Sequence, residues 1–314
     1  MSTTIYSARK IITMNPNQPE VSHVAVRDGR ILGAGSLDDL AGWGAYTLDE
    51  RFADKVLMPG LIEGHAHTME GALWSFCYVG WFDRRDPGGK VWDGLKSVDS
   101  VVARLIEAEK TLSDPDEPLL GWGLDPIYME NVRMTRADLD RVSTTRPIGI
   151  LHASGHILNV NTKGLELAGL LHEGNNHPGI PLGTDRLPTG ELKSPEIIMP
   201  AGKHVGMDRA FLAADAQGLR NYGKLCVRAG VTTSSDLGLQ LDDALVSVFE
   251  DVTGEDHYPV CLVAFRINMG MGPKELVGYT AKLKQRTTDR LDLGRIKVVA
   301  DGSIQGFSAR MLWP

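Results

Sequence analysis

The sequence predicts an α/β protein in which a small β-rich segment precedes strands and helices that alternate along the chain. Three observations support this prediction. Short apolar runs separated by turn residues fill residues 4–57 and are typical of strands. From residue 231 onward, apolar strands alternate with amphipathic helices, which is the pattern of a parallel sheet. Residues 70–205 are too long for one βα unit and are expected to form an insertion.

Residues 1–57 are expected to form a small β-domain without catalytic residues. An Asp28-Gly29 pair lies between two alternating apolar runs, and this arrangement is a strong signal for a two-residue hairpin turn. Strands are expected at residues 4–7, 10–13, 22–27 and 30–33.

The next segment, residues 56–67, carries a metal-ligand pattern. Its apolar run is broken by Pro59-Gly60 and ends in His65-Ala66-His67. Residues i and i+2 of an extended strand point to the same face, so both imidazoles can reach one cation while Ala66 faces away. Neutral imidazole binds zinc, iron, nickel and copper. The alternative is a pair of surface histidines on an ordinary strand, and the flanking sequence favours the metal site.

The insertion carries helical and strand patterns of its own. Its segment 175–200 has five prolines and several glycines, a composition typical of an irregular lid or binding loop. Other expected elements are strands at 119–122 and 148–152, helices at 98–112 and 162–168, and a helix at 208–228 after the insertion. The strand at 148–152 is expected to lead into the helix at 162–168.

Residues 58–314 are interpreted as a partial TIM barrel. Strands are expected at residues 231–236, 260–267 and 295–300, and helices at 241–253 and 274–285. With the strand of His65 and His67 counted first, they make four parallel strands, about half of a (β/α)8 barrel. Half a barrel leaves open sheet edges, which folded proteins avoid. We therefore expect the missing carboxy-terminal half, or a second copy of the chain, to cover them.

Composition and charge argue against several function classes. The 314 residues are 42% hydrophobic and 23% charged, as in an ordinary globular protein. A net charge of −7 without a basic stripe argues against nucleic acid as a partner. Without a signal segment or an apolar run of ~20 residues, we expect a cytoplasmic protein with no membrane partner. Three scattered cysteines suggest no disulfide framework, and Cys77 is expected to be a buried thiol rather than a ligand.

These motifs together resemble the amidohydrolase superfamily, in particular the branch of N-substituted formamide deformylase and related metal-dependent hydrolases. The matching segments cover nearly the whole chain and are Val26 to Ile31, Met58 to His67, Ser154-Gly155-His156 followed by Asn161, Ala229 to Thr233, and Ile296 to Ser303. The resemblance implies a (β/α)8 barrel joined to a small β-sandwich, with the metal site at the carboxyl ends of the barrel strands. One departure is Glu63, where the family more often carries Asp as a support for the strand.

The resemblance implies a ligand set. His65 and His67 would bind the more buried metal, and Lys297, carboxylated on its amine, would bridge two metals. An unmodified lysine inside a barrel is a costly unpaired cation, whereas a carbamate is an anion that divalent ions neutralise. The alternative is that Lys297 extends to solvent or pairs with Asp301. The implied cofactor is one or two divalent ions, with zinc expected.

The resemblance also suggests residues that contact the substrate. His156 matches a histidine that faces the active site in the family, and its alternative is a structural role. His152, four residues earlier, is expected only to pack or pair locally. Trp122 and Asp301 are further candidates for the pocket, although Asp301 in its Asp-Gly-Ser context is equally typical of a turn. Five aromatic residues could line a roomy pocket or form the core of the insertion: Trp74, Phe76, Tyr78, Trp81 and Phe82.

The implied reaction is cleavage of a non-peptide C–N bond in a small amide-type substrate, by attack of metal-bound hydroxide on the carbonyl carbon. In the family, the general base and the remaining ligands lie on later barrel strands, so they are expected beyond residue 314. Candidate substrates are N-substituted amides, formamides and cyclic amides. The alternative is a catalytically inactive scaffold or binding module of the same fold. A less favoured alternative is an isomerase or decarboxylase.

Overall fold

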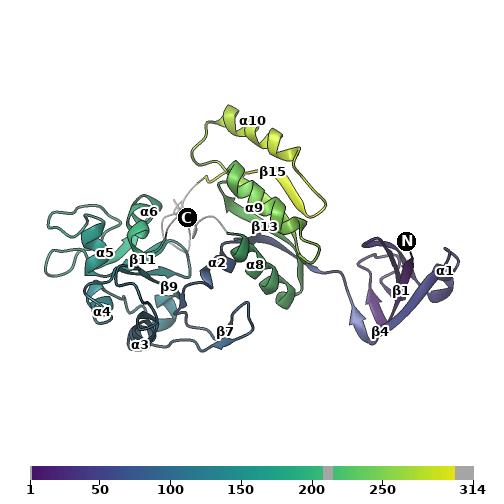
Figure 1. Cartoon of the computed structure of the whole chain (residues 1–314), viewed down its shortest axis with the longest axis horizontal. Coiled ribbons are helices and arrows are strands. Elements are labelled where there is room, and N and C mark those ends of the chain that lie inside the picture. Colours follow the sequence, from purple (N-terminus) through teal and green to yellow (C-terminus); the bar gives the residue numbers. More distant parts are fainter. Residues whose placement is uncertain (1, 208–214, 301–314) are drawn as a thin grey trace, which may run out of the picture. The chain divides into compact units, whose positions relative to one another are not determined.

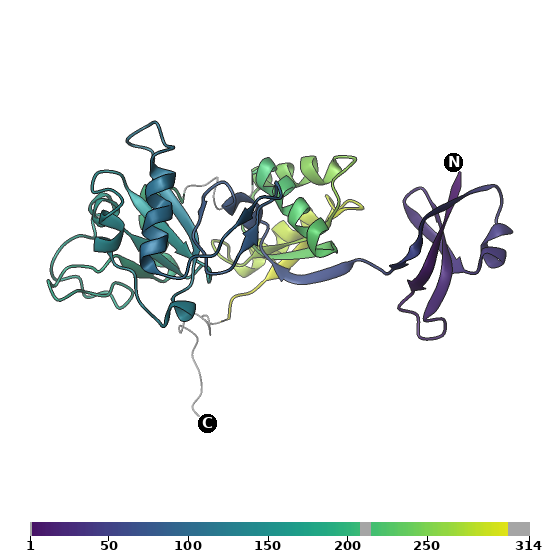
Figure 2. The same ribbon diagram turned by 90° about the horizontal axis from the view of Figure 1, so that it is seen from below.

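The computed structural model describes residues 2–207 and 215–300 of the chain. The chain divides into two compact units, Met1–Leu61 and Ile62–Pro314. Figure 1 labels the elements of each unit, and Figure 2 shows the same elements from a second direction.

The first unit contains a four-stranded sheet in the order β3-β2-β1-β4. Its elements are β1 (Thr3–Ile12), β2 (Glu20–Arg27), β3 (Arg30–Gly35), α1 (Leu37–Ala41) and β4 (Tyr46–Leu57). Ile5, Ala25 and Leu40 form its small core. The two strands expected before residue 14 are one strand, whose register shifts between Ser7 and Ile11.

The hairpin predicted at Asp28-Gly29 is confirmed. Both residues have positive φ angles, 53° for Asp28 and 72° for Gly29, and they join β2 to β3. Two positive φ angles are what a type I′ turn requires, and Gly adopts them without steric cost. The described strands of this unit form a single sheet, so the two-layer sandwich stays a prediction.

The second unit contains a four-stranded sheet in the order β15-β14-β13-β5. Its strands are β5 (Leu61–Ala66), β13 (Val231–Leu239), β14 (Cys261–Ile267) and β15 (Leu291–Lys297). Pairing is parallel between β13 and β14 and between β14 and β15. Helices α8 (Ala216–Ala229), α9 (Asp243–Gly254) and α10 (Pro273–Lys284) alternate with these strands (Figure 1). This order is that of consecutive βα units, and the described strands form an open sheet rather than a closed barrel.

The packing of this sheet explains why the apolar pattern of the sequence predicted its alternating strands and helices. Phe249 and Val246 of α9 and Leu262 of β14 are fully or almost fully buried in one apolar cluster. The helix predicted at 241–253 and the strand predicted at 260–267 are confirmed to within two residues. The last strand runs from Leu291 to Lys297 rather than from 295 to 300, because Leu291 and Leu293 carry its buried positions.

The insertion has a second sheet of its own, in the order β12-β11-β10-β9-β6. Its strands are β6 (Cys77–Tyr78), β9 (Leu119–Leu124), β10 (Ile148–His152), β11 (Ile157–Val160) and β12 (Glu191–Lys193). Around it lie α2 (Glu70–Leu73), α3 (Val98–Glu109), α4 (Arg136–Asp140), α5 (Thr162–Leu167), α6 (Pro195–Gly202), two 3-10 turns (Pro126–Met129 and Lys203–Val205) and a small hairpin, β7 (Arg84–Arg85) with β8 (Val91–Trp92). Helix α3 packs against this sheet through Val101 and Leu105.

Two expectations for the insertion were wrong. The strand at 148–152 does not lead directly into a helix, because β11 pairs with it first as an antiparallel hairpin. The segment 175–200 is not irregular throughout, since it contains β12 and most of α6. A three-residue strand shows no periodicity, and prolines at 195 and 200 conceal the helix. For the helix predicted at 208–228, residues 208–214 lie outside the described part, and α8 begins after its cap Asp215.

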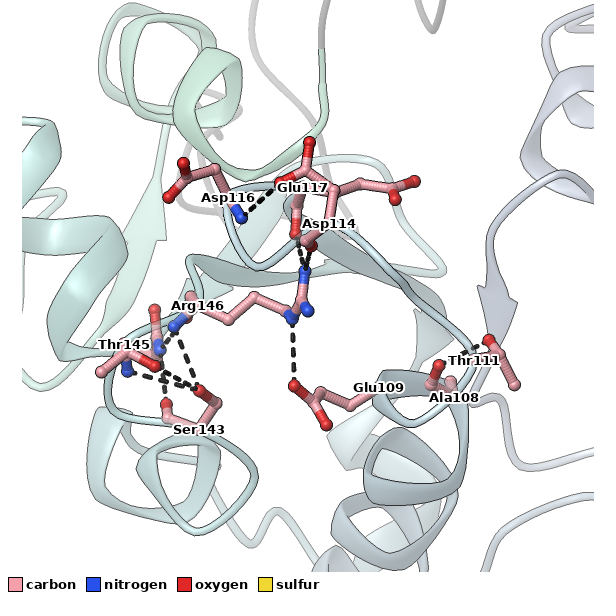
Figure 3. Close-up of polar contacts among 10 residues, drawn as sticks. Ala108, Glu109, Thr111, Asp114, Asp116, Glu117, Ser143, Thr145 and Arg146 are labelled. Atoms are coloured by element: carbon pink, nitrogen blue, oxygen red, sulfur yellow. Dashed lines mark hydrogen bonds and ion pairs between the residues drawn. The ribbon is translucent and has the colours of Figure 1, made fainter.

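Arg146 joins the insertion's helix α3 to the loops that start strands β9 and β10 (Figure 3). Its guanidinium is buried, and its Nε donates to Glu109 Oε1 at 3.1 Å. Its Nη1 donates to the carbonyl of Asp114 at 2.7 Å and to that of Glu117. A buried cation with a carboxylate and two carbonyl partners is well compensated. This residue therefore fixes the strand starts whose other ends form the site described next.

Candidate active site

His65 and His67 lie together at the carboxyl end of β5. Their ring centroids are 5.6 Å apart, and the rings are nearly perpendicular, at 80°. The backbone N–H of His65 donates to Glu63 Oε1 at 3.0 Å, so Glu63 braces the strand end. The two-residue spacing thus places both imidazoles side by side, as an extended strand requires.

A buried carboxylate from the neighbouring strand holds this strand end. Asp236 of β13 is 2% exposed, and its Oδ2 accepts from the backbone N–H and the hydroxyl of Thr68 at 2.7 and 2.6 Å. Its Oδ1 lies 3.4 Å from His67 Nδ1. Burial alone would raise the pKa of Asp236, but its hydrogen bonds to His67 and Thr68 outweigh it, and the pKa is lowered. An ionised carboxylate here favours a proton on His67 Nδ1, which leaves Nε2 free as a ligand.

Gly238 allows this contact. A Cβ at that position would lie 2.7 Å from His67 Nδ1, closer than real Cβ atoms approach a neighbour. Its N–H also donates to Asp236 Oδ1 at 2.9 Å. Sequence reasoning missed Asp236, although a carboxylate near the end of a predicted buried strand was a signal that could have identified it.

The donor set is partly suited to a divalent metal ion. Two adjacent imidazoles suit zinc and similar ions, and the carboxylate beside His67 Nδ1 is the usual support of a metal-bound histidine. Within residues 2–207 and 215–300, however, no group of three or more His, Cys, Asp or Glu side chains could hold a metal ion. The two predicted ligands, His65 and His67, are therefore too few by themselves for a metal site, and their role as ligands stays a prediction.

Lys297, the third predicted ligand, lies elsewhere on the sheet. It is the last residue of β15, which forms the edge opposite to β5. Three strand spacings separate the two edges, about 14 Å across a flat sheet at ~4.8 Å each. The described sheet does not bring Lys297 to the histidines, and its bridging role stays a prediction. Asp301 lies outside the described residues.

A pocket of about 500 Å³ extends from the two histidines into the insertion. Its walls include His65 and His67 on one side and aromatic side chains on the other. The aromatic members are Tyr78, Trp81, Phe82, Trp122 and Tyr128. The structure therefore brings Trp122 into the same cavity as the predicted ligands.

The five aromatic residues of unclear role divide between pocket and core. Tyr78, Trp81 and Phe82 line the pocket, and Tyr78 is also a buried member of the apolar cluster of the insertion, against which Trp74 and Phe76 pack. This wall is tightly packed because its rings contact one another. The Phe82 and Tyr128 centroids are 4.8 Å apart, and those of Tyr78 and Trp122 are 5.0 Å apart.

Charged groups are few along this wall and are paired. The guanidinium of Arg84 lies 5.9 Å from the Trp122 ring centroid and donates to Glu70 Oε1 at 2.9 Å. Asp125 accepts from the backbone N–H of Ile127 at 3.1 Å and caps the following 3-10 turn. The insertion side of the pocket is therefore mainly aromatic.

Two histidines of the insertion, His152 and His156, lie in different surroundings. His156 is exposed in the turn between β10 and β11, and its backbone N–H donates to Ser154 Oγ at 3.3 Å. His152, which was expected only to pack or pair locally, is 4% exposed and lines the pocket. The predicted substrate contact of His156 stays a prediction.

Cys77 behaves as a structural thiol. It is half-buried in β6, and burial raises its pKa to about 11. A thiol with so high a pKa stays protonated at neutral pH, and metal ligation requires the thiolate.

Among the described helices, none is long and apolar enough to cross a membrane.

Residues 53–314 match the family described as the Amidohydrolase family. The structure agrees with this match, because it combines a parallel βα sheet with a His-x-His pair at a strand end and a pocket beside that pair. The chain belongs to the amidohydrolase family.

Two curated relatives are each 26% identical to this chain. Putative amidohydrolase YtcJ of Bacillus subtilis (strain 168) matches 97% of this chain and 55% of its own length. Protein LONG AFTER FAR-RED 3 of Arabidopsis thaliana matches 73% of this chain and 37% of its own length. The chain thus spans about half or less of the length of these relatives.

Two solved structures are similar in fold. One is an uncharacterized metal-dependent hydrolase from Pyrococcus horikoshii OT3, with a TM-score of 0.61 and 18% identity, over 96% of this chain and 55% of that one. The other is an uncharacterized metal-dependent hydrolase from Pyrococcus furiosus, with a TM-score of 0.58 and 17% identity, over 96% and 57%. At these identities the likeness is one of fold, and the fold is mixed α/β.

Proposed function

We propose that this chain forms the first half of the (β/α)8 barrel of a metal-dependent amidohydrolase that cleaves a non-peptide C–N bond. One observation carries the proposal: the His65 and His67 rings, 5.6 Å apart, open onto an aromatic-walled pocket of about 500 Å³. Such a pocket beside metal-ligand residues is the usual form of a small-molecule active site.

The metal would be held by His65 and by Nε2 of His67, with zinc as the expected ion. Lys297, as a carbamate, would be a further ligand only in a complete barrel that brings the end of β15 to the histidines. A divalent ion there would supply a nucleophile at neutral pH, because it lowers the pKa of bound water from ~15.7 to ~7. Asp236 would keep the His67 ring in the productive tautomer. We assign the general base and the remaining ligands to a carboxy-terminal barrel half, or to a second copy of the chain.

The substrate would be a small N-substituted amide, with formamides included, as in the deformylase branch. Tyr78, Trp122 and Phe82 offer an apolar surface to the N-substituent, and this contact would place its carbonyl near the histidines. The insertion would also exclude water from that end of the pocket. The free thiols of Cys77, Cys226 and Cys261 agree with a reducing, cytoplasmic location.

A second candidate is a catalytically inactive scaffold or binding module of the same fold. It is favoured by the lack of a three-donor group within the described residues. Both candidates predict ligand binding in the pocket. They differ in whether metal binds at His65 and His67.

Metal analysis of the purified chain separates these candidates. We expect one or two divalent ions per chain by inductively coupled plasma mass spectrometry, and loss of metal in His65→Ala and in His67→Ala. The exposed His172→Ala is the matched control and should retain metal. The same samples are then assayed for metal-dependent hydrolysis of N-benzylformamide. A metal content near zero, or one unchanged by both substitutions, would leave the scaffold as the better description.

A further inference from the structure

His152 is held in one tautomer by the insertion. Its Nε2 lies 2.5 Å from Oδ1 of Asn159, and Asn159 Nδ2 donates to the carbonyl of Met134 at 2.8 Å. A carbonyl can only accept, so the amide nitrogen of Asn159 must face Met134 and its oxygen must face His152. Nε2 of His152 therefore carries the proton, and Nδ1 has a free lone pair.

The surroundings also keep His152 neutral. Burial lowers the pKa of His152, and this effect outweighs the opposing hydrogen bond to Asn159. The nearby carboxylate of Glu191 does not restore the charge, because it is paired with Arg133 and with Lys193. A neutral imidazole with a protonated Nε2 presents an acceptor, and no donor, at Nδ1.

The position of His152 on the pocket wall allows its Nδ1 to contact a bound ligand. His152 lines the pocket beside Trp122 and Leu151, at the carboxyl end of β10. Within the described part of the chain, no hydrogen bond to its Nδ1 is formed. His152 Nδ1 is not one of the fully buried polar atoms that lack a partner, so it retains accessible surface, and a ligand N–H that replaces water there gains about the free energy of one hydrogen bond.

We propose that His152 is a substrate-binding residue whose Nδ1 accepts a hydrogen bond from the N–H of a secondary amide. It would thereby select substrates with an N–H next to the scissile carbonyl over tertiary amides. This inference rests on the proposed function, because the amide is its substrate class. It assigns to His152 a role that is separate from metal binding by His65 and His67.

The tautomer is tested first, on the chain without ligand. Two-bond ¹H–¹⁵N spectra of histidine-labelled protein distinguish the two ring nitrogens, and the His152 signals are identified by their absence from His152→Gln. We expect protonated Nε2 and unprotonated Nδ1. A proton on Nδ1, or a charged ring at pH 7, would overturn the inference.

Binding is tested with two probes that differ in one N–H, N-benzylacetamide and N-benzyl-N-methylacetamide. We expect the first to bind about three- to tenfold more tightly, as one hydrogen bond implies. Its binding should also shift the Nδ1 resonance of His152, and the N-methyl probe should not. Failure of both probes to bind, or equal affinities, would refute the proposal.

Two variants separate the hydrogen bond from the steric effect of the methyl group. His152→Gln keeps a donor near Nε2 for Asn159 but removes the acceptor at Nδ1, so the preference should fall to about one. His152→Asn places an amide oxygen near Nδ1 and should keep the preference. An unchanged preference in His152→Gln, with native circular dichroism, would show that the methyl group alone is responsible.

These measurements also separate this inference from the proposed function. A chain that prefers the N–H probe through His152 but hydrolyses no amide keeps the binding role and loses the reaction. A chain that hydrolyses amides in a metal-dependent manner, with no preference between the probes, keeps the reaction and loses the role of His152.

Discussion

Glu191 shows how a buried carboxylate supports the pocket without entering it. Its side chain is 6% exposed, Oε2 accepts from Arg133 Nε at 2.7 Å, and Lys193 Nζ lies 3.0 Å from Oε1. Burial alone would raise the pKa of Glu191, but hydrogen bonds from Arg133 and Lys193 outweigh it, and the pKa is lowered. The ionised form is thus favoured by folding.

A lowered pKa makes the contribution of Glu191 to stability depend on pH. It is fully present above the unfolded-state pKa of ~4.3 and is lost as pH falls through the lower folded-state value. We expect Glu191→Gln to reduce the free energy of unfolding by about 2 kcal/mol at pH 7. The reduction should shrink as the pH falls below about 4. Urea unfolding across this pH range measures it.

The exposed Glu107→Gln is the control and should change stability by no more than about 0.5 kcal/mol at any pH. A Glu191→Gln effect of equal size at pH 7 and at acidic pH would mean that shape, rather than charge, accounts for the loss.

At the scale of single residues, the sequence revealed only what is local. His65 and His67 were predictable because a two-residue spacing on a strand determines their common face. Asp236 lies 169 residues from His67, and its contact depends on β13 lying beside β5. His152 was interpreted as locally paired, which is correct for Nε2, but only the tertiary fold places it in the pocket.

At the scale of elements, Asn161 connects three segments of the insertion. It is fully buried, and its Oδ1 accepts from the backbone N–H groups of Ile148 and Gly164 at 3.0 and 2.9 Å. Its Nδ2 donates to the carbonyls of Ser143 and Arg146, both at 2.9 Å. It therefore caps α5 and ties that helix to the start of β10. This accounts structurally for one position of the family motif.

We expect Asn161→Ala to lower the free energy of unfolding by about 3 kcal/mol or more, because four backbone groups, three of them in buried contacts, lose their partner. Thermal or urea unfolding monitored by circular dichroism measures the change. The exposed Asn176→Ala is the matched control. Equal stability of the two variants would show that water or relaxation of the loop replaces these bonds.

Elements with a regular apolar period were predicted well, and short ones were not. Helices α9 and α10 and strands β10 and β14 match their predicted ranges to within one or two residues. β11 and β12 have four and three residues, too few to show a period, and their pairing with β10 is a tertiary fact. The insertion sheet thus combines a strand that was predicted, β10, with two that were not, β11 and β12.

At the scale of the molecule, β5 and β15 are the two outer strands of the four-stranded sheet, and no other strand within residues 2–207 and 215–300 pairs with their outer edges. Near them, Ile62 is 75% exposed and Val298 is 63% exposed. Exposed apolar strands at a sheet edge favour pairing with another strand. This agrees with the proposal that a complementary barrel half, or a second copy of the chain, covers them.

We expect the isolated chain to self-associate through these edges, and Ile62→Lys to weaken the association by tenfold or more, because a charge on an edge strand opposes pairing. Sedimentation velocity over a range of concentrations measures the effect. A lysine in place of an exposed side chain should leave the stability of the monomer nearly unchanged. A wild-type chain that stays monomeric at every concentration would contradict this expectation.

The histidines and the aromatic wall belong to different sheets, and this division has an evolutionary consequence. The β5–β13 pair fixes His67 through Asp236, whereas Trp122 and His152 depend on the β9–β10 pair of the insertion. Mutations in the insertion can therefore change which molecules enter the pocket without disturbing the histidine pair. Under the proposed function, transfer of an insertion between homologues would transfer the substrate preference, while the type of reaction would stay with the histidine pair of the recipient.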